Sequence, residues 1–256
     1  MELIPYLKRE EIRKITTNEE LDEIVLREIG KKKFEEYKKL GKEFASRNTK
    51  KNVKIFYNFL MENQIHNYFK GLFFEEIKKE IPILNEEINN YDNVLDIGCN
   101  SGLKTAFYAA NHPQTRFVGI DISEEPLKHA AELSRTYRLK NTDYALMDLS
   151  DLGFKEQFDL VMADHSLQES VNYEYCFDCG KNHLSHAFEL KLEKIYNVMK
   201  PGKLIVVLTP SDKKVFKDSF SFMQENAGFK PTRTIEVNYT QYGRNLTDLI
   251  FIAEKE

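Results

Sequence analysis

The stretch that most constrains this chain runs from Tyr91 to Lys104, with the sequence YDNVLDIGCNSGLK. Its apolar segment, Val94–Ile97, predicts a short buried strand. Gly98 and Gly102 then allow the backbone to turn and to pass close to a ligand, because no Cβ stands in the way. Residues 105–110 can begin a helix whose first amides face that ligand. The sequence therefore predicts a strand, turn and helix of the kind that binds nucleotides.

A second β-type segment supports this interpretation. Arg116–Asp121 ends in a carboxylate 19 residues beyond Gly102, about where a nucleotide-binding βαβ unit places an acid for both ribose hydroxyls. A glycine turn alone is weak evidence, because many βα turns use glycine only to change direction. The turn also has Asp96 before its first glycine and Asn100 where a dinucleotide fingerprint prefers glycine. These two residues point away from a dinucleotide.

Two further motifs follow in order, Asp148-Leu149 and the FDLV of Phe158–Val161. Together with VLDIGCNSG at Val94–Gly102 and VGID at Val118–Asp121, they make the sequence resemble the class I S-adenosylmethionine-dependent methyltransferases. The resemblance covers roughly Tyr91 to the C-terminus. It implies an α/β fold with a Rossmann-like, seven-stranded, mostly parallel sheet whose last strand is antiparallel. It also implies S-adenosylmethionine as cofactor and in-line transfer of its methyl group to a nucleophile.

The rest of the chain agrees with such a fold. Strand-type and helix-type segments alternate after the glycine turn, which predicts a parallel sheet with right-handed crossovers. We expect strands at 117–121, 143–147, 157–163 and 203–208, helices at 104–111, 124–139, 184–199 and 211–227, and a closing hairpin from 233–239 and 248–253.

Residues 1–88 contain no convincing strand, and we expect them to form a helical N-terminal cap before a methyltransferase domain at 89–256. Glycines at 30, 41 and 71 are expected to separate the helices, and Pro82 with Asn89 and Asn90 to mark the boundary. The aromatic-rich stretch 56–74 has two interpretations. It is a packed amphipathic face, or it is a lid in which Tyr57, His66 and Tyr68 face the substrate.

The resemblance assigns the first group of cofactor residues to the glycine turn. Asp96 and the backbone from Gly98 to Gly102, including Cys99 and Asn100, would lie against the methionine part of S-adenosylmethionine. Asp96 could instead only cap a helix or keep a loop soluble. Cys99 itself is expected to be a small buried residue.

The resemblance places a second group along the carboxyl ends of the next strands. Asp121 would bind the ribose hydroxyls, with Ile122 packing on the adenine. Asp148 would lie near the exocyclic amine of adenine, where Leu149 offers a backbone amide. Asp164 would lie beside the sulfonium. For each of these carboxylates the alternative is a structural cap or a solvated loop residue.

The loop after the fourth expected strand is where such folds accept substrates. His165 is a candidate general base toward a hydroxyl, because imidazole titrates near neutral pH; the alternative is a hydrogen-bonded structural histidine. Glu169, Tyr173 and Tyr175 are weaker candidates. The loop lacks the Asn-Pro-Pro-Tyr or Asp-Pro-Pro-Tyr signature of amino-group methylation on adenine or glutamine, which disfavours a nucleic-acid substrate.

A short Cys and His segment follows. Cys176, Cys179, His183 and His186 offer two thiolates and two imidazoles, a ligand set that suits zinc. The spacing from Cys179 to His183 is tight for such a site. A redox dithiol and an ordinary loop are the alternatives.

Composition limits the partners. A net charge of −4 provides no general attraction to nucleic acid, and a mean hydropathy of −0.52 with no apolar run of about 20 residues predicts no membrane span. The start of the sequence lacks the layout of a secretion signal, and three cysteines are too few for a disulfide framework. We therefore expect a cytoplasmic protein. The sequence gives no indication of an oligomeric state.

The most direct functional interpretation is a methyltransferase of a small molecule, acting at oxygen or nitrogen. Lys31–Lys54 contains ten Lys or Arg against three Glu, which would favour RNA or protein as substrate if it lay beside the pocket, although such a run is more often a solvated face. A third alternative is a catalytically inactive cofactor-binding partner protein.

Overall fold

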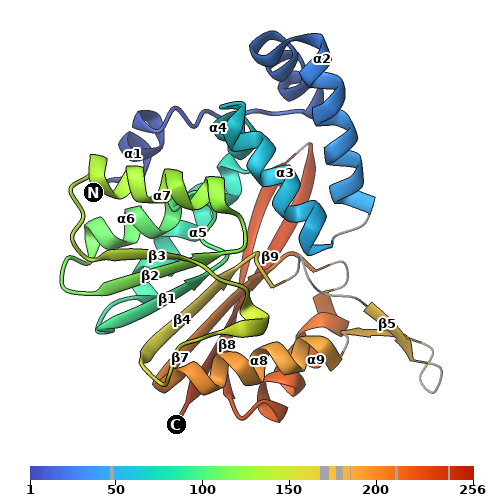
Figure 1. Ribbon diagram of the computed structural model, residues 1–256. Helices are drawn as coiled ribbons and strands as arrows, with labels where there is room; N and C mark the ends of the chain where they lie inside the picture. The colour runs from blue at the N-terminus through green and yellow to red at the C-terminus, as the bar shows by residue number, and fades with distance from the viewer. Residues whose placement is uncertain (47–48, 168–172, 177–180, 185, 211–212, 242) are drawn as a thin grey trace.

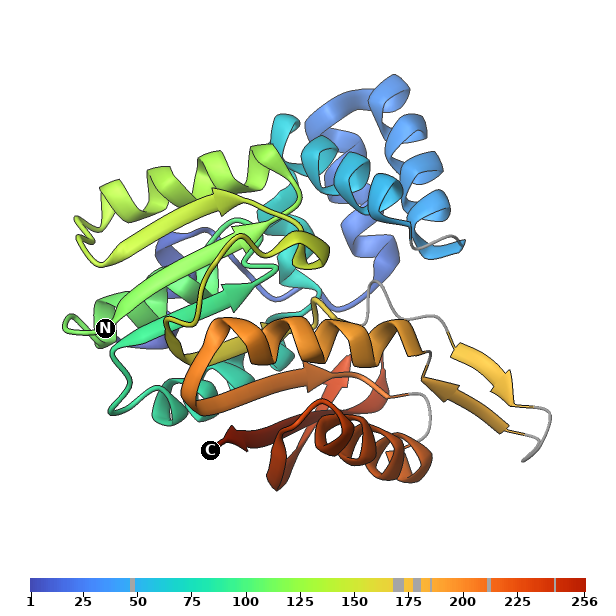
Figure 2. The same ribbon diagram turned by 60° about the horizontal axis from the view of Figure 1, so that its bottom comes forward.

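The computed structural model describes residues 1–46, 49–167, 173–176, 181–184, 186–210, 213–241 and 243–256 (Figure 1). It consists of a central sheet with helices on both faces and a group of helices from the N-terminal third at one end. Figure 2, turned toward the lower face, shows the short β5–β6 hairpin projecting away from this body.

The main sheet has seven strands in the order β3-β2-β1-β4-β7-β9-β8. The five strands from β3 to β7 are parallel, and β9 is antiparallel to both of its neighbours. This confirms the predicted fold class. The strands are β1 Asn93–Ile97, β2 Arg116–Asp121, β3 Thr142–Leu146, β4 Phe158–Asp164, β7 Met199–Leu208, β8 Lys230–Gln241 and β9 Arg244–Lys255.

Alternate residues of the central strands pack into two core clusters on opposite faces. In β7, Leu204 and Val206 belong to the cluster under α8 (His186–Val198) and α9 (Lys213–Asn226), whereas Ile205 and Val207 belong to the cluster on the opposite face of the sheet. That other face is covered by α5 (Phe74–Glu87) and α6 (Leu103–Asn111), with α7 (Glu124–Thr136) beside them (Figure 1). Strands buried on both faces explain the continuous apolar runs of the sequence.

The N-terminal third is helical, as expected. Besides α5 it contains α1 Leu3–Arg9, α2 Asn18–Ser46, α3 Lys50–Glu62 and α4 His66–Gly71. The expected break at Gly30 is a kink within α2, with a φ of 75°, and α4 ends at Gly71. The expectation at Gly41 is wrong, because α2 continues through it. Aromatic side chains of α2, α3 and α4 form a third core cluster, which agrees with the packed-face interpretation of 56–74.

Two other expectations need correction. Pro82 lies inside α5 rather than at its end; packing of Ile81 and Leu84 into the core outweighs the hydrogen bond that proline removes. The chain turns instead at Asn90, whose φ is 74°. The helix expected from Leu184 begins at His186, because Lys181–Leu184 forms β6, paired with β5 (Tyr173–Cys176). Among the described residues, no helix combines the length and apolar character of a membrane span.

Candidate functional site

A cavity of about 460 Å³ opens at the carboxyl ends of β1 and β4. The strand order changes direction between these strands, and open α/β sheets bind ligands at such a switch point. One wall is the turn after β1 together with the ends of β2 and β4. The facing wall consists of N-terminal side chains, namely Phe44, Lys50, Val53, Tyr57, His66, Phe69, Lys70, Phe73, Glu76 and Ile77.

Both glycines of the turn have the positive φ and the close packing that favour glycine. Gly98 has a φ of 75°, and a Cβ there would lie 2.2 Å from the Cβ of Ser166. Gly102 has a φ of 70° and packs against Ala130, which a Cβ would approach to 2.7 Å. Asn100 is also in the left-handed region, with a φ of 52°. The two glycines thus let the turn pack closely against Ser166 and Ala130.

Asp121 ends β2 and joins this turn to it. Its Oδ2 accepts a hydrogen bond from the Asn100 amide at 2.9 Å, and its Oδ1 accepts one from the Ser123 amide at 2.8 Å. Burial raises the pKa of Asp121, and these amides oppose the rise. Asp121 and the next residue, Ile122, both line the cavity.

Asp96 lies deeper, at 5% exposure. Its Oδ2 accepts a hydrogen bond from the Thr105 hydroxyl of α6 at 2.5 Å. Burial raises the pKa of Asp96 to about 6, against the effect of that hydrogen bond. Cys99 is buried as expected, and burial raises the pKa of its thiol.

Asp148 is the structural cap that was considered as an alternative for it, and it also lies in the cavity wall. It lines the cavity with Leu149, and its Oδ1 caps the following 3₁₀ turn by accepting from the Ser150 amide at 2.8 Å. Lys50 of α3 reaches across to its Oδ2 at 2.7 Å. This ion pair joins the N-terminal helices to the sheet beside the cavity.

Lys70 of α4 lies on the opposite wall from the strands and was missed by sequence reasoning. Its Nζ donates to the Ser101 hydroxyl at 2.6 Å. Burial, with some repulsion from Lys104, lowers the pKa of Lys70 to about 7. A partly buried lysine amine thus lies next to the glycine turn.

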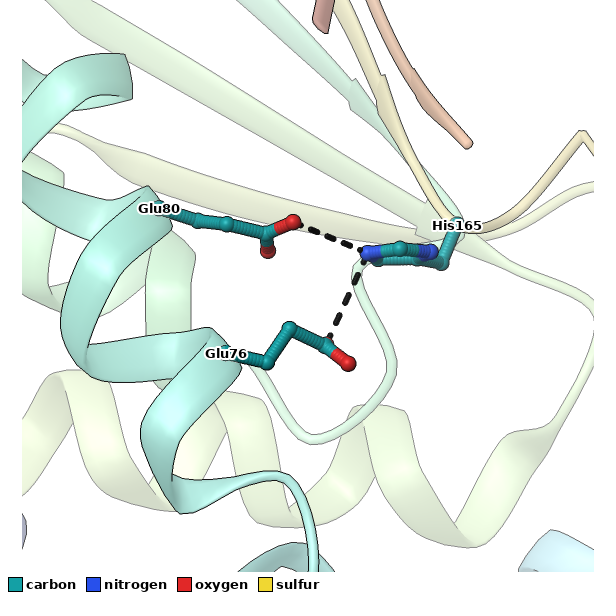
Figure 3. A group of neighbouring side chains, drawn as sticks. All are labelled: Glu76, Glu80 and His165. Atoms are coloured by element: carbon teal, nitrogen blue, oxygen red, sulfur yellow. Dashed lines mark hydrogen bonds and ion pairs between the residues drawn. The ribbon is translucent and has the colours of Figure 1, made fainter. Parts of the chain in front are cut away.

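His165, the predicted base, lies at the acidic end of the cavity (Figure 3). Its Nε2 is 3.1 Å from Glu80 Oε1 and 3.5 Å from Glu76 Oε1. Figure 3 shows both glutamates reaching from successive turns of α5 toward the imidazole. Asp164 lies beside it and pairs with Lys104 at 2.5 Å. Lys104 also binds Glu80, at 3.0 Å.

Burial and the neighbouring charges act in opposite directions on the pKa values of His165, Glu76 and Glu80. Burial alone would lower the pKa of His165, but Glu80 and Glu76 outweigh it and raise that pKa to about 10. Burial raises the pKa of Glu76 to about 8, with His165 opposing. Burial would also raise the pKa of Glu80, but Lys104 and His165 lower it to about 2. The imidazole is therefore held in its protonated form at neutral pH when no other cation is present.

Sequence reasoning missed Glu76 and Glu80 because they stand in a run of charges, EEIKKE, that is typical of a solvated face. They are 8% and 0% exposed. The available signal was their spacing of four residues among Ile77, Ile81 and Leu84, which places both on the apolar face of the helix.

Several predicted residues lie elsewhere or outside the described part. Of the three lid candidates, Tyr57 and His66 line the cavity, whereas the Tyr68 ring contacts Arg13. Glu169 and Cys179 lie outside the described residues. Cys176 ends β5, His183 lies in β6 and His186 begins α8. The side chains of these three lie outside the described part, so the zinc hypothesis stays a prediction.

Comparison with known proteins agrees with this geometry. A family model described as "Methyltransferase domain" matches residues 88–245, which is more than half of the chain. The chain belongs to the class I S-adenosylmethionine-dependent methyltransferase family. The 235L protein of Invertebrate iridescent virus 6, named as a methyltransferase, is 25% identical over 144 residues, covering 56% of this chain and 47% of the relative. This methyltransferase-family chain spans about half or less of the length of the curated relatives it matches.

Solved structures share the methyltransferase fold. Magnesium protoporphyrin IX methyltransferase from Synechocystis PCC 6803, solved with bound S-adenosylmethionine, aligns with a TM-score of 0.54 at 18% identity, covering 71% of this chain and 78% of that one. The N-methyltransferase NodS from Bradyrhizobium japonicum WM9, in complex with S-adenosylhomocysteine, aligns with a TM-score of 0.54 at 16% identity, covering 70% and 87%. At these identities the similarity concerns the fold of the methyltransferase domain.

Proposed function

We propose that this protein is a methyltransferase that transfers the methyl group of S-adenosylmethionine to an oxygen or nitrogen of a small molecule. The observation that carries the proposal is the cavity at the β1/β4 switch point, with the Gly98–Gly102 turn and Asp121 in its wall. Its volume of about 460 Å³ falls in the range of small-molecule sites.

The charges and the conformation of the turn support the following contacts with the cofactor. Asp121 binds the two ribose hydroxyls, with Ile122 against the adenine. Asp148 and the Leu149 amide form hydrogen bonds with the edge of the adenine, and Asp164 lies beside the sulfonium. The family resemblance implies these roles, and the position of all five residues in the cavity wall supports them (Asp121, Ile122, Asp148, Leu149 and Asp164).

The methionine part of the cofactor carries an ammonium and a carboxylate. We assign the ammonium to Asp96 and the turn formed by Gly98, Cys99, Asn100 and Gly102. We assign the carboxylate to Lys70, whose amine lies beside the turn in the cavity wall, whereas Lys104 is paired with Glu80 and Asp164. A carboxylate next to Lys70 would stabilise the charged ammonium of that side chain.

The acceptor side is formed by the N-terminal helices, which we propose act as a cap over the bound cofactor. Of the structural neighbours named above, one is named for magnesium protoporphyrin IX, a small molecule, and the other is named as an N-methyltransferase. RNA or protein as substrate has one observation in its favour, because Lys50 of the basic Lys31–Lys54 run lines the cavity. However, Lys50 pairs with Asp148, and Lys38 of the same run pairs with Asp22 at 2.5 Å.

The deciding experiment is calorimetric titration of the folded protein with S-adenosylmethionine and S-adenosylhomocysteine. Asp121→Asn should weaken both ligands about 10- to 100-fold, the value of one or two hydrogen bonds to a charged group. Asp143→Asn is the matched control, because Asp143 is an exposed carboxylate paired with Arg116 at the other end of β2. If the wild type binds neither ligand, the proposed function is wrong.

The general-base role of His165 stays a prediction; it requires an unprotonated imidazole, whereas Glu80 and Glu76 raise the pKa of His165 to about 10. It is tested by His165→Gln: a fall in methyl-transfer rate at unchanged cofactor affinity is expected, and an unchanged rate would contradict the role. The cytoplasmic location and the inactive-partner alternative are likewise predictions, the second of which is excluded by any measured methyl transfer.

A further inference from the structure

Four carboxylates converge on one imidazole at the acidic end of the cavity. From Nε2 of His165 the distances are 3.1 Å to Glu80, 3.5 Å to Glu76, 3.7 Å to Asp164 and 3.9 Å to Asp248. A protonated Nε2 has one N–H, which points at one acceptor. The imidazolium therefore cannot satisfy the carboxylates that surround it.

Lys104 relieves only part of this charge. It binds Glu80 at 3.0 Å and Asp164 at 2.5 Å. With every group ionised, the four carboxylates exceed Lys104 and the imidazolium by two negative charges. Removing such an excess from water is costly unless it is neutralised. Protonated carboxyl groups or a further cation are the two ways to neutralise it.

The spacing of the atoms favours a metal ion. One ligand atom each from Glu76, Glu80 and His165 lies within 4.8 Å of the other two. Bonds of about 2.0–2.2 Å to nitrogen and oxygen place neighbouring ligand atoms about 3.0–3.5 Å apart in octahedral or tetrahedral sites. The imidazole-to-carboxylate separations of 3.1 and 3.5 Å match these edges.

Asp248 is an independent indication. It enters from β9 and is fully buried, and within the described residues neither of its carboxylate oxygens has a hydrogen bond of ordinary geometry. Its Oδ2 lies 3.9 Å from the same imidazole nitrogen. The Thr209 and Tyr239 hydroxyls lie beside this carboxylate, and a buried carboxylate directed at the ligand cluster is suited to be a further metal ligand.

The backbone and a hydroxyl hold the imidazole in place. His165 has a φ of 55°, uncommon for a non-glycine residue, and its amide donates to the Val207 carbonyl at 3.0 Å. Its Nδ1 lies 3.5 Å from the Thr209 hydroxyl. Orientation of a ligating histidine through its second nitrogen is usual at metal sites.

We propose that Glu76, Glu80 and His165 bind a divalent cation, with Asp248 completing the ligand set. Three carboxylates and one imidazole suit Mn²⁺, Fe²⁺ or Zn²⁺. Glu76 and His165 line the cavity, whereas Glu80 and Asp248 do not. The cation would thus have one side toward the cavity, where it could hold an acceptor oxygen or nitrogen near the methyl group. This inference goes beyond the proposed function and does not depend on it.

The test uses Mn²⁺ as the probe, because manganese prefers oxygen and imidazole ligands to thiolates. Full-length protein is treated with a chelator, exchanged into metal-free buffer and titrated with Mn²⁺ while free Mn²⁺ is followed by electron paramagnetic resonance. We expect one Mn²⁺ per chain, and binding at least tenfold weaker in Glu76→Gln and in Glu80→Gln. Asp143→Asn should bind like the wild type.

Two further measurements locate the ion. Pulsed paramagnetic resonance of the bound Mn²⁺ should show coupling to an imidazole nitrogen that disappears in His165→Gln. The double variant Cys176→Ser, Cys179→Ser should keep full Mn²⁺ binding, which separates this site from the predicted zinc segment.

Each variant is accepted only if its thermal unfolding remains cooperative. Wild-type protein that binds S-adenosylmethionine and takes up no Mn²⁺ would overturn the metal proposal and leave the proposed function intact. Mn²⁺ binding that persists unchanged in the Glu76→Gln and Glu80→Gln variants would also overturn it, because the ion would then lie elsewhere.

Discussion

Gly98 shows how one residue determines whether the cofactor site can form. An added methyl group would stand 2.2 Å from the Cβ of Ser166, at a φ of 75°. We expect Gly98→Ala to lower the free energy of unfolding by about 1–3 kcal/mol from backbone strain alone and to weaken S-adenosylmethionine further by displacing the turn. Gly153→Ala is the control, since nothing lies within 4 Å of its Cβ position. Equal effects of the two substitutions in denaturant unfolding and calorimetry would contradict this account.

The ionisation of Asp96, again a single residue, affects both the stability of the fold and the binding of the cofactor. Burial raises its pKa to about 6, so the folded state holds this proton more tightly than the unfolded state. Stability from the neutral carboxyl is complete below about pH 4 and is lost as the pH rises through 6. Asp96→Asn should therefore stabilise the cofactor-free protein at pH 8 by on the order of 2 kcal/mol, and by less at pH 5.

The same substitution should weaken S-adenosylmethionine, because the charge we assign to its ammonium is removed. Denaturant unfolding at pH 5 and pH 8, with calorimetry at pH 8, measures both effects. A stability gain that does not change with pH would show that ionisation of Asp96 is not its source.

At the scale of elements, α4 contributes a partly buried lysine, Lys70, to the cavity wall that faces the strand ends. The pKa of Lys70 is lowered to about 7, mainly by burial, so the amine is mostly neutral at pH 8. Binding of the cofactor carboxylate should restore its charge. We expect binding of S-adenosylmethionine to be accompanied by the uptake of close to one proton by the protein at pH 8, and of clearly less at pH 6. Calorimetry in buffers of different ionisation enthalpy measures this uptake.

Lys70→Met should abolish this proton uptake and weaken binding. Lys128→Met is the control, since Lys128 lies on the exposed side of α7 and pairs with Glu124 and Glu125. If the Lys70 variant keeps the proton uptake of the wild type, another group is responsible.

Helix α5 shows where prediction from sequence reached its limit. Its helical character was predictable, and so was the alternation of helices with the strands of the seven-stranded sheet, because both depend on local periodicity; the β5–β6 pair was not predicted. Pro82 was misread because local propensity yields to the packing of Ile81 and Leu84. Glu76 and Glu80 were missed because their burial depends on contacts with β8, where Tyr239 donates to Glu76 at 3.3 Å. Asp121 was found because its place follows from spacing along one βαβ unit.

At the scale of the whole molecule, the first helix and the last strand of the described fold share a core. One core cluster contains Tyr6 and Leu7 of α1 together with Ile250 and Ile252 of β9. The division at residue 88 stays a prediction, and this cluster extends across it. We therefore expect thermal unfolding in a single transition.

Saturating cofactor should shift that transition as a unit. At 100 times its dissociation constant, S-adenosylmethionine adds about 2.7 kcal/mol, or roughly 5–10 °C in Tm for a chain of this size. Differential scanning calorimetry with and without ligand measures the shift. Two separate transitions, of which only one moves, would show that the cap and the sheet unfold independently.

The hairpin of β8 and β9 has a consequence for how the chain folds during translation. β9 lies between β7 and β8 in the sheet, so the strand of this sheet that is translated after the other six fills an interior position. Helices α1 to α5 leave the ribosome long before Ile250 and Ile252, with which α1 and α5 share a core. Until then their apolar faces lack part of their partner surface, and nascent chains in this state are prone to aggregate. A stalled ribosome carrying all but the final strand would hold a chain with a gap in the middle of its sheet.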